Sequence, residues 1–114
     1  DVLAAARPAL EKLLEGRAAT TVALPTMLEV LPFGASKREG VRAYLDHFGL
    51  DEGADLLAVG DGENDADMLR RAALGVAVGN AAAAAADAAD VVVAPNDAGG
   101  AAQALYMAIA LAKS

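Results

Sequence analysis

Residues 56–68 of this chain read LLAVGDGENDADM and carry its clearest structural pattern. Apolar residues with the pattern of a buried strand run directly into a tight Gly-Asp-Gly turn, and residues that can open a helix follow. A strand that ends in this way places carboxylates at the carboxyl edge of a sheet, where open α/β sheets bind their ligands. Carboxylates at that edge suit a hard cation such as Mg²⁺. The plainer alternative is an acidic turn whose Asp and Asn only cap a helix.

The rest of the chain alternates between strand and helix patterns. Ser36 and Glu39 have the spacing of a capping box, and Pro25-Thr26 separates two β-rich runs that we expect to form a hairpin. Such alternation predicts an α/β fold with a parallel sheet and right-handed crossovers. Predicted helices span 7–15, with Pro8 in the first turn, and 36–48, 65–73, 81–86 and 100–112; predicted strands span 20–24, 27–31, 56–59, 75–78 and 91–94.

Three segments resemble the haloacid dehalogenase (HAD) superfamily. Residues 60–65, GDGEND, resemble its motif IV, of the GDxxND type. Residues 73–81, ALGVAVGNA, resemble the segment that follows motif IV in the Cof-type (IIB) phosphatases, with Ala73 where the family often has Gly. Residues 28–32, LEVLP, and then Gly34 to Lys37 resemble the lead-in to motif III. The three segments have the family's order and cover roughly residues 27–100.

The resemblance implies a Rossmann-like HAD core with a parallel sheet, of which this is the C-terminal part, plus a remnant of the α/β cap domain. We expect the cap remnant, a helix and a β-hairpin, at 1–33 and the core at 34–114, with the boundary near Pro32-Phe33-Gly34. The family's nucleophile motif, Asp-x-Asp-x-Thr/Val, is not found in this sequence, which begins at Asp1. We therefore expect a portion of a longer enzyme, inactive by itself and dependent on the missing N-terminal half.

The resemblance also assigns roles to four residues. It implies that Lys37, Asp61 and Asp65 are catalytic, that Lys37 and Asn64 bind a substrate phosphate, and that Asp61 and Asp65 hold Mg²⁺. Lys37 follows the helix-opening Ser36, and an ammonium beside a helix N-terminus forms an anion site. The alternatives are a solvated lysine, an Asn64 that serves the turn through its own backbone, and an Asp65 that is only a helix-terminal acid.

Other polar residues are expected at the surface. Glu63 and Asp67 are predicted to be exposed acids, and Arg70 and Arg71 to face solvent. His47 has no second His or Cys with which to form a metal site, so it is also assigned to the surface. The alanine run at 81–86 predicts a plain surface helix.

Composition limits the classes of function. The chain has 114 residues and a net charge of −7, which argues against nucleic acid as a partner. Its hydrophobic content is dominated by 31 alanines, so the core should be small. The longest apolar run, near 104–112, is too short to cross a membrane. We expect a soluble intracellular protein of the cytoplasm or an organelle stroma, with any N-terminal targeting segment outside this sequence.

The function implied by the resemblance is Mg-dependent hydrolysis of a small phosphorylated metabolite, such as a sugar phosphate, through an aspartyl-phosphate. The alternatives are the phosphorylation domain of a P-type cation pump, which carries a similar GDGxND loop, and a non-catalytic HAD-like module in an assembly. Neither a nucleic-acid nor a membrane partner is expected. Self-association is expected through the edge of strand 56–59, because an unpaired parallel strand exposes backbone donors and acceptors.

Overall fold

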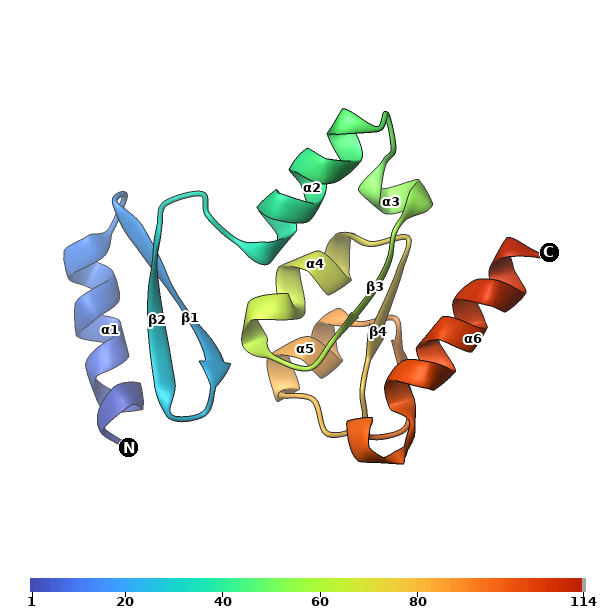
Figure 1. Cartoon of the computed structure of the whole chain (residues 1–114). Coiled ribbons are helices and arrows are strands. Elements are labelled where there is room, and N and C mark those ends of the chain that lie inside the picture. Colours follow the sequence, from blue (N-terminus) through green and yellow to red (C-terminus); the bar gives the residue numbers. More distant parts are fainter. Residues whose placement is uncertain (114) are drawn as a thin grey trace.

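The computed structural model describes residues 1–113, which form two separate sheets (Figure 1). A two-stranded antiparallel sheet pairs β1 (Ala18–Leu24) with β2 (Met27–Pro32) beside helix α1 (Val2–Leu14). A three-stranded parallel sheet has the order β3-β4-β5. Its strands and the remaining helices are β3 (Leu57–Gly60), β4 (Leu74–Ala77), β5 (Val91–Val92), α2 (Lys37–His47), α3 (Glu52–Asp55), α4 (Ala66–Arg71), α5 (Ala83–Ala88) and α6 (Gly100–Ala112), with 3₁₀ turns at Glu63–Asp65 and Asn96–Ala98.

The predicted α/β class is confirmed, and most elements lie within a few residues of their expected positions. The hairpin turns at Pro25-Thr26, where Leu24 faces Met27, and Ser36 Oγ accepts a hydrogen bond from the Glu39 amide at the start of α2. The sequence pattern missed α3, a single turn whose cap is the Asp51 side chain. The observed β5 is also shorter than the predicted strand 91–94.

The prediction that Pro8 lies in the first turn of its helix is wrong. Asp1 accepts hydrogen bonds from the Leu3 and Ala4 amides and caps α1, so the helix begins at Val2 and Pro8 lies inside it. Proline removes one backbone hydrogen bond from the helix interior. The Asp1 cap therefore moves the start of the helix from the predicted residue 7 to Val2.

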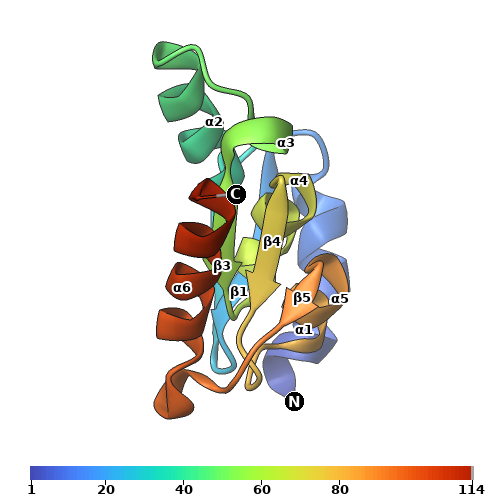
Figure 2. The ribbon, with the colours of Figure 1, turned by 90° about the vertical axis from the view of Figure 1, so that its right-hand side faces the viewer.

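Helices cover both faces of the parallel sheet, with α4 and α5 on one face and α6 on the other (Figures 1 and 2). Alternation along β3 directs Ala58 toward the first face and Val59 toward the second. The buried cluster on the α6 side is Val76, Val78, Val93 and Ala104, and the cluster on the α4–α5 side is Ala58, Leu69 and Ala85. In the described structure β3 is an edge strand of this sheet.

The alanine run forms a packed helix rather than the plain surface helix that was predicted. Ala85 in α5 is fully buried against the cluster that contains Leu69. A methyl side chain keeps the helix axis close to its neighbours, so a run of alanines can form a packing face as well as a solvated one. Because so many buried side chains are alanine, the core depends on close backbone approach more than on large side chains.

Gly75 shows how close that approach is, and it supports a prediction on stability. A Cβ at Gly75 would lie 2.2 Å from the Leu69 carbonyl oxygen of α4, which is a backbone atom that cannot move aside. We expect Gly75→Ala to lower the free energy of unfolding by roughly 2–3 kcal/mol. The matched control is Gly40→Ala in α2, where a Cβ meets nothing within 4 Å and where alanine should add roughly 0.5–1 kcal/mol. Urea denaturation of both variants measures the difference; equal stabilities would contradict the assigned packing.

Candidate functional site

The turn after β3 is organised by one buried carboxylate. Oδ2 of Asp65 accepts hydrogen bonds from the backbone amides of Asp61 at 3.0 Å and Gly62 at 3.1 Å. Only 4% of Asp65 is exposed, the lowest exposure of any charged residue in the described structure. Gly60 allows this arrangement, because a Cβ there would lie 2.6 Å from Cβ of Asp65. The Gly-Asp-Gly pattern therefore permits the chain to fold back over the Asp65 side chain.

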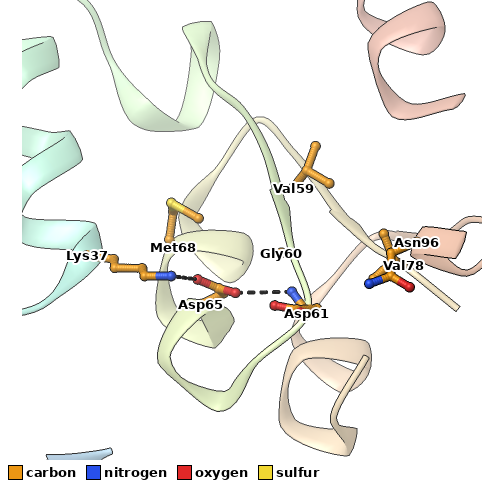
Figure 3. A pocket seen from close by; sticks show the side chains of 8 residues that line it. All are labelled: Lys37, Val59, Gly60, Asp61, Asp65, Met68, Val78 and Asn96. Carbon is orange, nitrogen blue, oxygen red and sulfur yellow. Dashed lines mark hydrogen bonds and ion pairs between the residues drawn. The ribbon is translucent and has the colours of Figure 1, made fainter. Parts of the chain in front are cut away.

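Lys37 reaches the same carboxylate from α2. Its Nζ lies 2.8 Å from Oδ1 of Asp65, so the two carboxylate oxygens are divided between the lysine and the turn (Figure 3). The Lys37 side chain remains 55% exposed, which leaves ammonium hydrogens free for a ligand. The pair therefore presents a positive group to the cleft and holds it at a defined position.

A cleft of about 330 Å³ opens at this carboxyl edge of the sheet. Lys37, Asp61 and Asp65 all line it, so the structure brings together three of the four residues that the sequence singled out (Figure 3). Asp61 is exposed, and within residues 1–113 its carboxylate makes no described hydrogen bond or ion pair. Gly60, Val59, Met68, Val78 and Asn96 complete the lining.

Asn64, the fourth residue, does not line this cleft. It lines a neighbouring cleft with Lys37 and Ser36, and the β2 residues Glu29 and Leu31 form part of that wall. Lys37 is therefore shared by the two clefts. One cleft is also lined by Asp61 and the other by Asn64, and the chemical roles of all four residues stay predictions.

Of the two carboxylates predicted to hold Mg²⁺, Asp61 is the more accessible. Residues 1–113 contain no group of three His, Cys, Asp or Glu side chains that could hold a metal ion. The Asp65 oxygens already accept hydrogen bonds from Lys37 and two amides, whereas the Asp61 carboxylate faces the cleft. Mg²⁺ is commonly held by one or two carboxylates together with waters and phosphate oxygens. The Asp61 carboxylate fits that pattern, Asp65 orients the turn beside it, and a direct contact of Asp65 with the ion stays a prediction.

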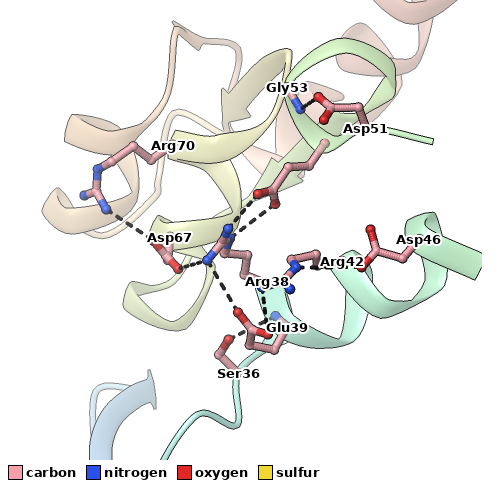
Figure 4. Close-up of polar contacts among 10 residues, drawn as sticks. Ser36, Arg38, Glu39, Arg42, Asp46, Asp51, Gly53, Asp67 and Arg70 are labelled. Carbon is pink, nitrogen blue, oxygen red and sulfur yellow. Dashed lines mark hydrogen bonds and ion pairs between the residues drawn. The ribbon is translucent and has the colours of Figure 1, made fainter. Parts of the chain in front are cut away.

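An ion-pair network fixes α2, and with it Lys37, against the helices that follow (Figure 4). The Arg38 guanidinium donates to Glu52 at 2.6 and 3.2 Å, and it also lies near Glu39 and Asp67. Since Arg38 adjoins Lys37 in α2, these contacts restrict where the lysine can point. Asp67 is exposed as predicted, and so are His47, Arg70 and Arg71.

The prediction that Glu63 is an exposed acid is wrong. Both of its carboxylate oxygens accept from the Arg7 guanidinium, at 2.8 and 3.0 Å, and one also accepts from the Val22 amide. The Arg7 guanidinium lowers the pKa of Glu63 below its ordinary value, with the Val22 amide acting in the same direction. Residues 63 and 7 are far apart in the sequence, so no local pattern indicated this contact.

Asn96 was missed among the cleft residues. It follows β5 at the same carboxyl edge, so the rule that placed Asp61 there could have included it. Its backbone amide donates to Oδ1 of Asn80, which joins the loops after β4 and β5.

Asp65 carries a prediction on pH dependence. Burial raises its pKa, but hydrogen bonds from Lys37 and from the Gly62 and Asp61 amides outweigh that effect and leave the pKa below its ordinary value. Its contribution to the free energy of unfolding is thus present above about pH 4, the ordinary aspartate pKa, and is lost as the pH falls through the lowered folded-state value. We expect Asp65→Asn to cost about 2 kcal/mol at pH 7 and markedly less near pH 3.

Urea denaturation at both pH values measures this effect, with Asp67→Asn as the control. Asp67 lies in the same segment but is half exposed and makes only long ion pairs. A cost for Asp65→Asn that does not change with pH would contradict the assignment.

Comparison with known proteins supports the fold and identifies the family. A family model described as haloacid dehalogenase-like hydrolase matches residues 2–105. The chloroplastic endoribonuclease YBEY of Arabidopsis thaliana is 42% identical over 100 residues, which cover 88% of this chain and 17% of that protein. The chain therefore spans less than a fifth of the length of this curated relative.

Two solved structures are also similar. The phosphatase BT1666 of Bacteroides thetaiotaomicron aligns with a TM-score of 0.79 and 33% identity, over 90% of this chain and 38% of that one. The HAD subclass IIB sugar phosphatase BT4131 aligns with a TM-score of 0.75 and 33% identity, over 86% of this chain and 38% of that one. These matches confirm the resemblance to the IIB phosphatases that the motifs indicated. By its sequence and its fold, the chain belongs to the haloacid dehalogenase-like hydrolases.

Proposed function

We propose that this chain supplies the electrostatic part of a Mg²⁺-dependent site that hydrolyses small-molecule phosphate monoesters. The observation that carries the proposal is the meeting of Lys37 and Asp61 in one cleft, with Asp65 holding the lysine in place. A positive group and an unpaired carboxylate side by side match a phosphate and the cation that accompanies it. The alternative, a turn that only caps a helix, does not explain why Lys37 of α2 also lines this cleft.

Each residue has a distinct task in the proposed reaction. The Lys37 ammonium binds and neutralises equatorial phosphoryl oxygens, and the Asn64 amide can donate to the same group from the neighbouring cleft. Asp65 orients the Lys37 ammonium by accepting a hydrogen bond from it at 2.8 Å. Asp61 would hold the Mg²⁺, which reduces the repulsion between an attacking carboxylate and the phosphoryl oxygens.

The covalent step lies outside the residues of this sequence. The family resemblance assigns the attacking and proton-transferring aspartates to the Asp-x-Asp-x-Thr/Val motif, which these 114 residues do not contain. In the proposed enzyme the first aspartate attacks phosphorus and forms an aspartyl-phosphate, while the second protonates the departing alcohol oxygen. The second aspartate then takes a proton from the water that hydrolyses the intermediate and frees phosphate. The described chain binds and orients the phosphoryl group during both steps.

Sugar phosphates are the proposed substrate class. The support is the likeness to a structure whose protein is a subclass IIB sugar phosphatase. The endoribonuclease activity in the name of the plant relative is not proposed, because this chain covers only 17% of that protein. The net charge of −7 also disfavours a nucleic-acid substrate. No helix within residues 1–113 has the length and apolar character needed to cross a membrane.

The role of Asp61 can be tested by magnesium titration of the 114-residue chain, followed by amide NMR. We expect weak, saturable shifts confined to the turn after β3, since a single carboxylate gives an incomplete octahedral site. Asp61→Asn should abolish these shifts, whereas Asp67→Asn, which removes an acid from the same segment, should leave them unchanged. Shifts that survive Asp61→Asn would contradict the assignment of the metal to this carboxylate.

The role of Lys37 can be tested by inorganic phosphate binding in the presence and absence of Mg²⁺. We expect Mg²⁺ to raise the affinity for phosphate, because both would occupy the same cleft, and phosphate to raise the affinity for Mg²⁺ by the same factor. Lys37→Met should weaken phosphate binding by roughly tenfold or more, since a charge-assisted contact is lost. The matched control is Arg42→Met, which removes a half-exposed cation from the same helix. Equal losses in both variants would indicate only non-specific attraction by the helix.

A further inference from the structure

The N-terminal unit, defined here as residues 1–32 with α1, β1 and β2, is joined to the rest of the molecule in an unusual way. Both buried hydrophobic clusters of the described structure consist of residues from 56 onward, and neither includes a residue of the N-terminal unit. Its two strands pair only with each other. Figure 1 shows this unit beside the parallel sheet, connected through the segment that precedes α2. Hydrophobic packing of the core therefore does not hold it in place.

Polar contacts between the two parts converge on one side chain. Every described hydrogen bond that joins residues 1–32 to residues 36–113 has the Glu63 carboxylate as its acceptor. The donors are the Arg7 guanidinium in α1, the Val22 amide in β1 and, at 3.4 Å, the Thr21 hydroxyl. Glu63 is the first residue of the 3₁₀ turn that ends in Asp65. The link therefore terminates inside the turn that builds the candidate site.

The Arg7 end of this link is itself held rigidly. Its Nε donates to Glu11 of the same helix and to the Thr20 hydroxyl, and Nη2 donates to the Thr20 carbonyl as well as to Glu63. The side chains of Arg7 and Glu63 are 27% and 33% exposed, so water screens the pair only in part. A bidentate, preorganised arginine–carboxylate contact of this kind is among the stronger polar contacts that a protein surface makes.

The segment between the two parts offers a hinge. Pro32-Phe33-Gly34-Ala35 connects β2 to the cap of α2, and Gly34 has a φ of +87° with open space where a side chain would lie. Backbone rotation here would move the N-terminal unit without disturbing either hydrophobic cluster.

We infer that Glu63 is a positioning residue, and that the Arg7–Glu63 ion pair is a latch that holds the N-terminal unit closed over the Asp61 turn. In the closed state the β1–β2 hairpin and the turn enclose a cleft of about 430 Å³, with Leu24 and Pro25 on one wall and Asp61 and Gly62 on the other. Opening the latch separates these walls. The latch itself does not depend on the proposed function; only its effect on catalysis does. In the proposed enzyme the latch would hold the hairpin against the side of the site that Asp61 and Gly62 form.

Double electron–electron resonance between two spin labels measures the latch directly. The chain has no cysteine, so Ala9→Cys in α1 and Asp87→Cys in α5, both exposed, provide the two label sites without further changes. We expect one narrow distance distribution for the parent protein. Glu63→Gln should raise the ratio of open to closed molecules by roughly tenfold or more, which appears as a second, broader population.

Glu52→Gln is the matched control, because it breaks an arginine–glutamate contact of similar geometry that lies entirely within residues 36–113. Arg7→Met should reproduce the effect of Glu63→Gln, and the double variant should add nothing further. Circular dichroism with retained helix content shows that the variants remain folded. An unchanged distribution in both single variants, or the same broadening in Glu52→Gln, would overturn the latch. The measurement uses neither metal nor phosphate, so failure of the proposed function would leave its result intact.

Discussion

The structure depends on the requirement that a buried carboxylate find partners. Asp65 is removed from water at the end of the 3₁₀ turn, and an unpaired charge in that position would cost several kcal/mol. Its partners are the backbone of the preceding turn and a lysine from a different helix, 28 residues earlier in the chain. By satisfying one charge, the fold therefore closes the turn, positions Lys37 and leaves Asp61 facing the cleft. The candidate site follows from this electrostatic constraint.

Two acids of the same turn have opposite tasks because a 3₁₀ turn sends nearby side chains in different directions. Asp65 points inward and organises the cleft, whereas Glu63, two residues earlier, points toward the hairpin and binds Arg7. Each acid is therefore neutralised by its own cation, Lys37 in one case and Arg7 in the other. Asp61 is left as the acid of this turn without such a partner in the described structure, which makes it the group available to a cation.

Small residues make this arrangement compact. Glycine at 60 lets the Asp65 side chain lie against the end of β3, and glycine at 75 lets β4 run against the backbone of α4. Buried alanines at 58, 77, 85 and 104 act in the same way between the sheet and its helices. Close approach of backbones compensates in part for the small area that each side chain buries. Neither buried cluster includes a residue of the N-terminal unit.

Features that depend on neighbouring residues could be predicted from local sequence patterns. The apolar run before Gly60, the Ser36 cap and the Pro25-Thr26 turn predicted the strand, helix and hairpin that the structure has, and the motifs predicted the family. The edge rule for parallel strands also placed Asp61 beside a ligand cleft, because it needs only the order of strand and turn. Element ends were less certain, since the Asp1 cap and the single-turn α3 depend on individual side-chain contacts.

The contacts of the polar side chains, by contrast, depend on how distant segments pack together in the folded chain. Glu63 and Asp67 are acids of one short segment and could not be distinguished by local pattern, yet one anchors the N-terminal unit and the other faces solvent. The difference is set by Arg7, which lies 56 residues away and reaches Glu63 from α1, a helix that packs on β1. Ion pairs and buried alanines acquire their roles from neighbours that folding supplies, and such neighbours have no fixed spacing in the sequence.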